Sequence, residues 1–72
     1  MPDWVLPRRR QIGARIREAR LAANLTQAAL AERVGREHRT VHRWEYAQRV
    51  PNLEDLLLIA AAVDVPLADL VR

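Results

Sequence analysis

Apolar residues recur at helical spacing in the first third of the chain. They lie three or four residues apart, at Ile12, Ile16, Ala19 and Ala23. Arginines occupy much of the opposite side, so the pattern predicts an amphipathic helix over about 8–23, followed by Asn24 as a left-handed cap. Residues 1–7 contain two prolines and show no helical period, and we expect an N-terminal arm there, with Pro7 just before the helix or in its first turn.

The next part of the chain predicts two short helices joined by a tight turn, at Gln27–Val34 and at about Glu37–Tyr46. Thr26 can cap the first of them, because its hydroxyl oxygen can accept a hydrogen bond from a free N–H group. Gly35 can end that helix, since glycine adopts the left-handed conformation without a steric penalty. The second helix has an apolar side that includes Val41.

The last third of the chain predicts two more helices. Asn52 is suited to cap a helix, with Asp55 three residues further on and acidic side chains in the first turn. The helix that follows is apolar on nearly all sides up to Val63, which is typical of a central helix. Pro66 begins a last short helix over about 67–71. The predicted fold class is therefore all-α, a compact bundle of five helices.

Length and composition narrow the class of protein. The chain has 72 residues, which fits one domain. It has no cysteine, so disulfides and thiolate metal sites are excluded and a reducing compartment fits. No apolar run approaches the roughly 20 residues that span a bilayer, and no stretch has the pattern of a signal peptide. We expect a cytoplasmic protein that has no membrane partner.

Charge is distributed unevenly along the chain. Residues 1–50 carry eleven arginines and five acidic residues, a net charge of +6, whereas residues 51–72 have a net charge of −3. This division favours a basic face for phosphates and an acidic end that points away from them. Every basic residue is arginine, the better bidentate donor to phosphate and guanine, although a compositional bias of the genome would explain that equally well.

The main candidates for a functional site share one broad side of the second short helix. They are His38, Arg39, His42 and Arg43. Arginine can donate two hydrogen bonds to O6 and N7 of guanine, the commonest specific base contact. A helix that is apolar on one side and arginine-rich on the other, held by a glycine turn, suits insertion into the DNA major groove. The alternative is a charged face that contacts only water.

Around these residues the sequence resembles the Cro/C1-repressor type of helix-turn-helix family. The matching motifs are Leu-Thr-Gln-x-x-Leu-Ala from Leu25, Val-Gly at 34–35, Thr-Val-x-Arg-Trp-Glu from Thr40, and then Pro51, Leu53, Leu56-Leu57 and Ile59-Ala60. The resemblance extends from about Ile12 to Leu70. It implies that residues 8–72 form a lambda-repressor-like DNA-binding domain of five helices, which binds operator DNA, usually as a dimer.

The resemblance also implies roles for individual residues. It maps base reading onto His38, Arg39 and Arg43, and less directly onto His42, and it assigns Gln27 to a DNA phosphate. Further phosphate candidates lie in the turn and in the loop after the second short helix, at Arg36, Gln48 and Arg49. Three positions depart from the family pattern, which commonly has an apolar residue at Arg36, a serine or threonine at Glu37 and a glycine at Asp64.

Arg20 and Glu45 form a structural salt bridge by the same resemblance, between the end of the first helix and the end of the third. Two independent surface charges are the alternative. Trp44 stands beside Glu45, and we expect its ring to pack at the edge of the core rather than to stack on a base.

Catalytic and metal chemistry find little support in the sequence. His38 and His42 are four residues apart and could meet one metal ion, but there is no cysteine and no other histidine to complete a site. There is no glycine-rich phosphate loop, no nucleophile with its base and no paired acid and base. We expect no enzyme, no cofactor and no metal.

The sequence thus predicts a sequence-specific transcriptional regulator, a repressor that binds double-stranded DNA at a palindromic operator. The alternatives are the antitoxin of a toxin–antitoxin pair, or a protein-interaction module that uses the fold without reading DNA. Leu67, Leu70 and Val71 are the candidates for a homodimer contact. Around residues 4–10 three roles are open: contact with DNA through the arginines, contact with a partner subunit, or packing on the core.

Overall fold

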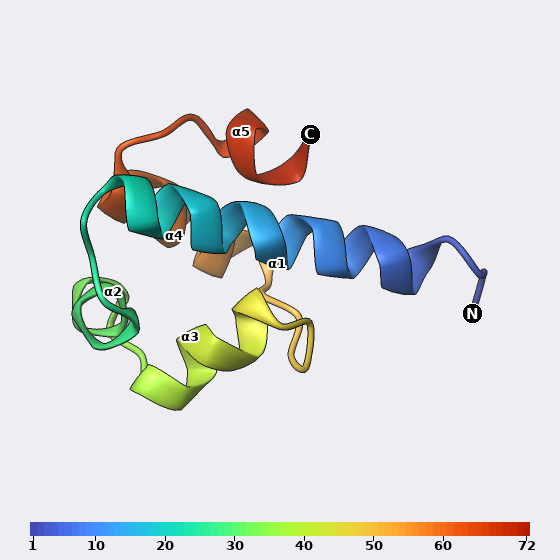
Figure 1. The fold of residues 1–72 in the computed structure, drawn as a ribbon, viewed down its shortest axis with the longest axis horizontal. Coiled ribbons are helices and arrows are strands. Elements are labelled where there is room, and N and C mark those ends of the chain that lie inside the picture. Colours follow the sequence, from blue (N-terminus) through green and yellow to red (C-terminus); the bar gives the residue numbers. More distant parts are fainter.

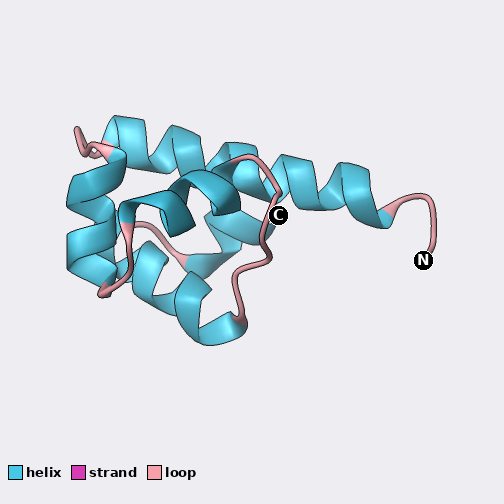
Figure 2. Cartoon of the chain, turned by 90° about the horizontal axis from the view of Figure 1, so that it is seen from below, coloured by secondary structure: helices cyan, strands magenta, loops and turns pink.

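The computed structural model describes all 72 residues and consists of helices and connecting loops alone (Figures 1 and 2). In chain order the helices are α1 Val5–Ala22, α2 Gln27–Val34, α3 His38–Glu45, α4 Leu53–Val63 and α5 Leu67–Val71. The predicted all-α fold with five helices is confirmed. None of these helices has both the length and the apolar character needed to span a membrane.

The start of α1 differs from the prediction. The helix begins at Val5, so its first turn includes Pro7 and lies inside the segment expected as an arm. Proline is tolerated in a first turn, because the N–H group that it lacks would have no partner inside the helix there. This end of α1 projects beyond the other helices (Figure 1). Trp4 and Leu6 remain 68% and 40% exposed, and they do not pack on the core.

Four helices end close to a residue in the left-handed conformation, among them α3, which Ala47 follows with φ of 58°. Gly35 follows α2 with φ of 69°, and nothing lies within 4 Å of the position that a Cβ would take. Asn24 and Asp64 have φ of 59° after α1 and α4. Asn and Asp tolerate this conformation better than other residues with a side chain, which explains how Asp64 replaces the glycine common in the family.

The helix α4 begins with a reciprocal cap. The Asn52 side chain accepts from the N–H group of Asp55 at 2.7 Å, and the Asp55 carboxylate accepts from the N–H group of Asn52 at 3.1 Å. Two free donors at the helix start are thereby satisfied. The cap fixes the direction in which the chain enters α4 after the loop 46–52.

The core is assembled from all five helices. Its buried residues are Ile16, Leu30, Ala31, Val34, Val41, Trp44, Ile59, Ala60, Val63 and Leu70. Trp44 is the largest of these side chains and is 1% exposed, so it is a structural residue rather than a base-stacking one. The helices α2 and α3, which the tight turn at Gly35 joins, are therefore held by one continuous apolar cluster.

Two expectations about burial were wrong. The helix α4 is not buried on all sides, because Leu53, Leu57 and Leu58 are 64%, 50% and 38% exposed. Conversely, Leu70 of α5 is 0% exposed, so it belongs to the core of its own chain and cannot be a dimer contact in this conformation. The helix α5 packs against both α1 and α4, and Leu70 is its one fully buried side chain.

Candidate nucleic-acid interface

The helix α3 divides cleanly into a buried and an exposed side. Thr40, Val41, Trp44 and Glu45 are buried. The residues His38, Arg39, His42 and Arg43 are all exposed and fall on the opposite side. The helix thus uses one side to join the core and leaves a complete row of donors and acceptors facing outward.

The start of α2 lies beside this exposed row. Thr26 caps α2 as predicted, because its hydroxyl oxygen accepts from the N–H group of Ala29 at 3.0 Å. The N–H groups of Gln27 and Ala28 have no partner within the chain. Free N–H groups at a helix N-terminus bind anions readily, since the helix dipole adds to their attraction.

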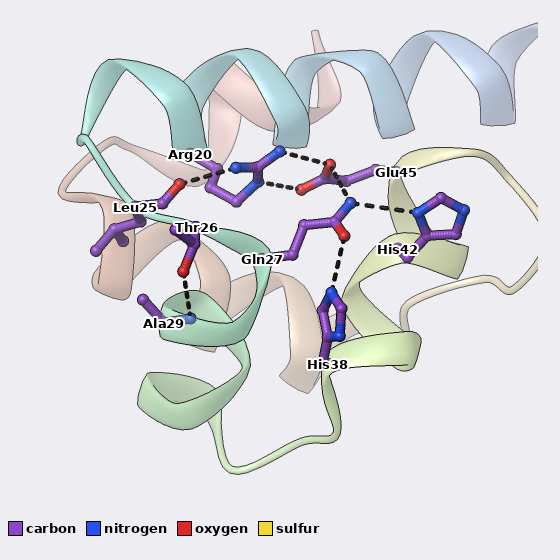
Figure 3. Close-up of polar contacts among 8 residues, drawn as sticks. All are labelled: Arg20, Leu25, Thr26, Gln27, Ala29, His38, His42 and Glu45. Carbon is purple, nitrogen blue, oxygen red and sulfur yellow. Dashed lines mark hydrogen bonds and ion pairs between the residues drawn. The ribbon is translucent and has the colours of Figure 1, made fainter.

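Arg20 and Glu45 form a buried ion pair (Figure 3). The guanidinium of Arg20 donates from Nε to Oε2 of Glu45 at 2.6 Å and from Nη2 to Oε1 at 3.1 Å. Its third nitrogen, Nη1, donates to the carbonyl oxygen of Leu25 at 2.8 Å. One arginine therefore joins α1 both to the end of α3 and to the segment that leads into α2.

Gln27 extends this pair toward the exposed side of α3 (Figure 3). Its Nε2 lies 3.2 Å from Oε1 of Glu45 and 3.4 Å from Nδ1 of His42. Its Oε1 lies 3.1 Å from Nε2 of His38. The side chain thus bridges the buried carboxylate of Glu45 and the two histidines of the exposed row on α3.

The predicted phosphate contact of the Gln27 side chain does not fit this arrangement. An amide group has two hydrogens to donate. Here one points to Glu45 and the other to His42, so none is free for a phosphate oxygen. No pattern in the sequence indicates this bridge, because it depends on the crossing of α2 and α3.

The other predicted phosphate residues are placed differently from one another. Arg36 donates from Nη2 to the Asp55 carboxylate at 2.9 Å, so it ties the turn after α2 to the start of α4. This contact explains the departure from an apolar residue at this position. Gln48 and Arg49 are exposed in the loop after α3, with no side-chain hydrogen bond inside the chain. They remain available to an outside partner.

Two polar concavities flank the arginines of α3. One is lined by Gln27, His38, Arg39, His42, Arg43 and Gln48, and its volume is about 380 Å³. The other has a similar volume and is lined by Gly35, Arg36, Glu37, Arg39, Thr40, Arg43 and Arg49. Arg39 and Arg43 line both. The surface is hollowed and basic at the place where a recognition helix would meet a nucleic acid.

The three arginines near the N-terminus do not form a free basic strip. Arg8 donates to the carbonyl oxygen of Val71, and Arg9 donates to that of Ala47 at 3.1 Å. These contacts fasten the first part of α1 to α5 and to the loop after α3. Arg10 is exposed.

A glycine in α1 also positions the site, although it was not among the residues predicted from the sequence. A Cβ at Gly13 would lie 2.6 Å from the carbonyl oxygen of Trp44 and 2.7 Å from that of Glu45. The absence of a side chain lets α1 approach the end of α3 closely enough for Arg20 to reach Glu45. A glycine inside a helical pattern is the signal that could have revealed it.

The structure brings no group of three potential ligands together that could hold a metal ion. His38 and His42 instead converge on Gln27, and the ring of His42 lies 4.6 Å from that of Tyr46 between centroids. The two imidazoles are thus arranged as hydrogen-bonding groups on the exposed side of α3.

The helix-turn-helix family model matches residues 16–70. The chain belongs to the helix-turn-helix family of the Cro/C1-repressor type. Members of this family are DNA-binding transcriptional regulators, and the chain is one of them. No curated protein matches the sequence.

Solved structures agree with this assignment. The restriction-modification controller protein C.AhdI from Aeromonas hydrophila is 34% identical, with a TM-score of 0.81 over 85% of this chain and 92% of that one. The DNA-binding domain of the P22 c2 repressor in solution is 32% identical, with a TM-score of 0.80 over 86% and 82% of the two chains. The P22 c2 repressor in complex with a synthetic operator is 33% identical, with a TM-score of 0.78 over 85% and 92%.

Proposed function

We propose that the protein is a repressor that places α3 in the major groove of its operator and reads base edges with the exposed row of that helix. One observation carries the proposal: all four side chains of the row are exposed together, while the other side of α3 is locked into the core. Arg39 and Arg43 are the residues suited to bind guanine.

Contacts with DNA phosphates would lie on either side of α3. Arg49 and Gln48 lie in the loop after α3, and the free N–H groups of Gln27 and Ala28 lie at the start of α2. These groups can fix the position of the domain on the backbone without reading sequence. Arg36 has a smaller part in this proposal, because its guanidinium is already paired with Asp55.

Two copies of the chain would bind one operator. The exposed Leu53 and Leu57 lie four residues apart, so they share one face of α4. Leu67 and Val71 of α5 are half-buried and keep part of their surface exposed. Such apolar surface on a domain of this size is what a second copy would cover, with the same patch on both subunits. Leu57 thus takes the place of the buried Leu70 among the candidate dimer residues.

A selection of bound sequences from random DNA tests the proposal. We expect an inverted repeat whose half-sites are centred about one helical turn apart. Leu57→Glu should weaken binding to the full repeat far more than to a single half-site, since a buried charge opposes pairing of the subunits. Leu6→Glu, on the projecting end of α1, is the matched control and should leave the full site bound.

Selection of an unrelated set of sequences would contradict the reading of bases by α3 and favour a protein-interaction module. Binding to the full repeat that neither variant weakens would contradict the dimer through α4. If Leu6→Glu is the damaging change, the subunits meet through the start of α1 and the assignment to α4 is wrong.

A further inference from the structure

The orientation of the Gln27 amide follows from its partner Glu45. A carboxylate paired with a guanidinium is ionised and has no hydrogen to donate. Since Glu45 is held by Arg20 through two hydrogen bonds, the group of Gln27 that lies 3.2 Å from its Oε1 must be the NH₂ group. The carbonyl oxygen of Gln27 must then face His38.

This orientation decides which ring nitrogen of His38 carries hydrogen. The carbonyl oxygen of Gln27 can only accept, so Nε2 of His38, at 3.1 Å, must donate. In a neutral imidazole the other nitrogen then has a lone pair and no hydrogen. Nδ1 of His38 has no partner in the protein, so it is an acceptor left for a ligand.

The same amide also contacts His42, but at Nδ1 rather than at Nε2. The NH₂ group of Gln27 donates, so Nδ1 of His42, at 3.4 Å, must accept and carries no hydrogen. Its Nε2 then carries the hydrogen, and in Figure 3 that nitrogen points away from Gln27. This contact is longer than the one to His38, and the neighbouring ring of Tyr46 helps to hold the imidazole in place.

We infer that Gln27, oriented by the buried Arg20–Glu45 pair, sets both histidines in the Nε2–H form, so that His38 offers DNA an acceptor and His42 offers it a donor. The inference rests on the proposed reading of bases by α3. It gives the two histidines opposite hydrogen-bonding roles although both are imidazoles.

The chemistry of the preferred bases follows. In the major groove, only adenine N6 and cytosine N4 donate hydrogen bonds. His38 should therefore prefer adenine or cytosine on the strand that it contacts. His42, as a donor, should prefer N7 or O6 of guanine, N7 of adenine or O4 of thymine.

The tautomers of His38 and His42 can be measured without DNA. Long-range proton–nitrogen correlation spectra of the ¹⁵N-labelled protein, at a pH where the rings are neutral, distinguish a nitrogen that carries hydrogen from one that does not. We expect an Nε2–H pattern for both histidines, more complete for His38. Gln27→Ala should return both rings to a mixture of the two forms, while the remaining spectrum shows that the domain is folded.

The preference for bases is measured in parallel. His38→Ala identifies the base pair that His38 reads, as the position at which selection is relaxed. The unaltered protein should favour adenine or cytosine there over guanine or thymine by about fivefold or more, the equivalent of about 1 kcal/mol. Gln27→Ala should reduce this preference and leave the positions read by Arg39 and Arg43 unchanged.

The results separate the inference from the function on which it rests. Mixed ring forms in the unaltered protein would overturn the inference even if DNA is bound specifically. A preference for guanine or thymine at the His38 position would overturn it as well. Fixed ring forms together with a lack of sequence preference would contradict the proposed function and, with it, the roles of the histidines as readers.

Discussion

Replacement of Glu45 by alanine is expected to reduce the free energy of unfolding by about 3–5 kcal/mol, because a buried ion pair loses one partner. Arg20 would keep its contact with the carbonyl oxygen of Leu25 but lose both contacts with the carboxylate. Its charge would be left nearly buried and unpaired. Urea unfolding of both proteins at the same temperature measures the difference.

The double replacement distinguishes an interaction between the two charges from independent contributions of each residue to stability. Arg20→Ala together with Glu45→Ala should destabilise less than the two single changes added together, since neither charge is then left alone. Glu45→Gln, which preserves the shape, keeps the measurement possible if the alanine variant does not fold. Glu18→Ala, at an exposed position of α1, is the control and should change stability by less than about 0.5 kcal/mol. Additive losses would show that the two charges do not interact.

Gly13→Ala is expected to destabilise the protein by about 3 kcal/mol, within the range for overpacking of a core. Helix propensity alone predicts the opposite sign, a gain of about 0.5–1 kcal/mol. The steric effect prevails because the new Cβ would meet two backbone oxygens, which cannot move aside as the end of a side chain can. Thermal or urea unfolding decides between the signs.

Ala14→Gly, at the exposed neighbouring position, is the matched control for this change. It should cost about 0.5–1 kcal/mol, the loss due to helix propensity alone. A Gly13→Ala protein more stable than the original would mean that α1 and α3 are not in close contact. The position of Arg20 opposite Glu45 would then need another explanation.

The elements that the sequence predicts best are those that local chemistry specifies. The bounds of α2 follow from Thr26 and Gly35, a cap and a left-handed residue that act within one turn. The start of α4 follows in the same way from Asn52 and Asp55. The start of α1 at Val5 was missed because residues 1–7 show no helical period, although Pro7 was expected just before the helix or in its first turn.

The parts that the sequence could not predict depend on distant contacts. A helix as apolar as α4 does not show from its pattern which side is buried, so Leu57 and Ile59 were not distinguished. The pairing of Arg36 with Asp55 requires the turn after α2 to lie beside the start of α4. For the site, the row on α3 was predicted from its spacing, while the bridge through Gln27 depends on how α2 and α3 cross.

In the proposed function, α3 reads bases whereas the loop after it holds the DNA backbone. Affinity for the selected operator and for scrambled DNA, measured over a range of salt concentrations, tests it for Arg39→Ala, Arg43→Ala and Arg49→Ala. The first two should lose about 1–3 kcal/mol on the operator and relax the preference at one base pair each. Arg49→Ala should weaken binding to all sequences alike and lower the salt slope by about one. Equal losses on operator and scrambled DNA for both α3 variants would contradict the claim and make α3 a charged surface without sequence preference.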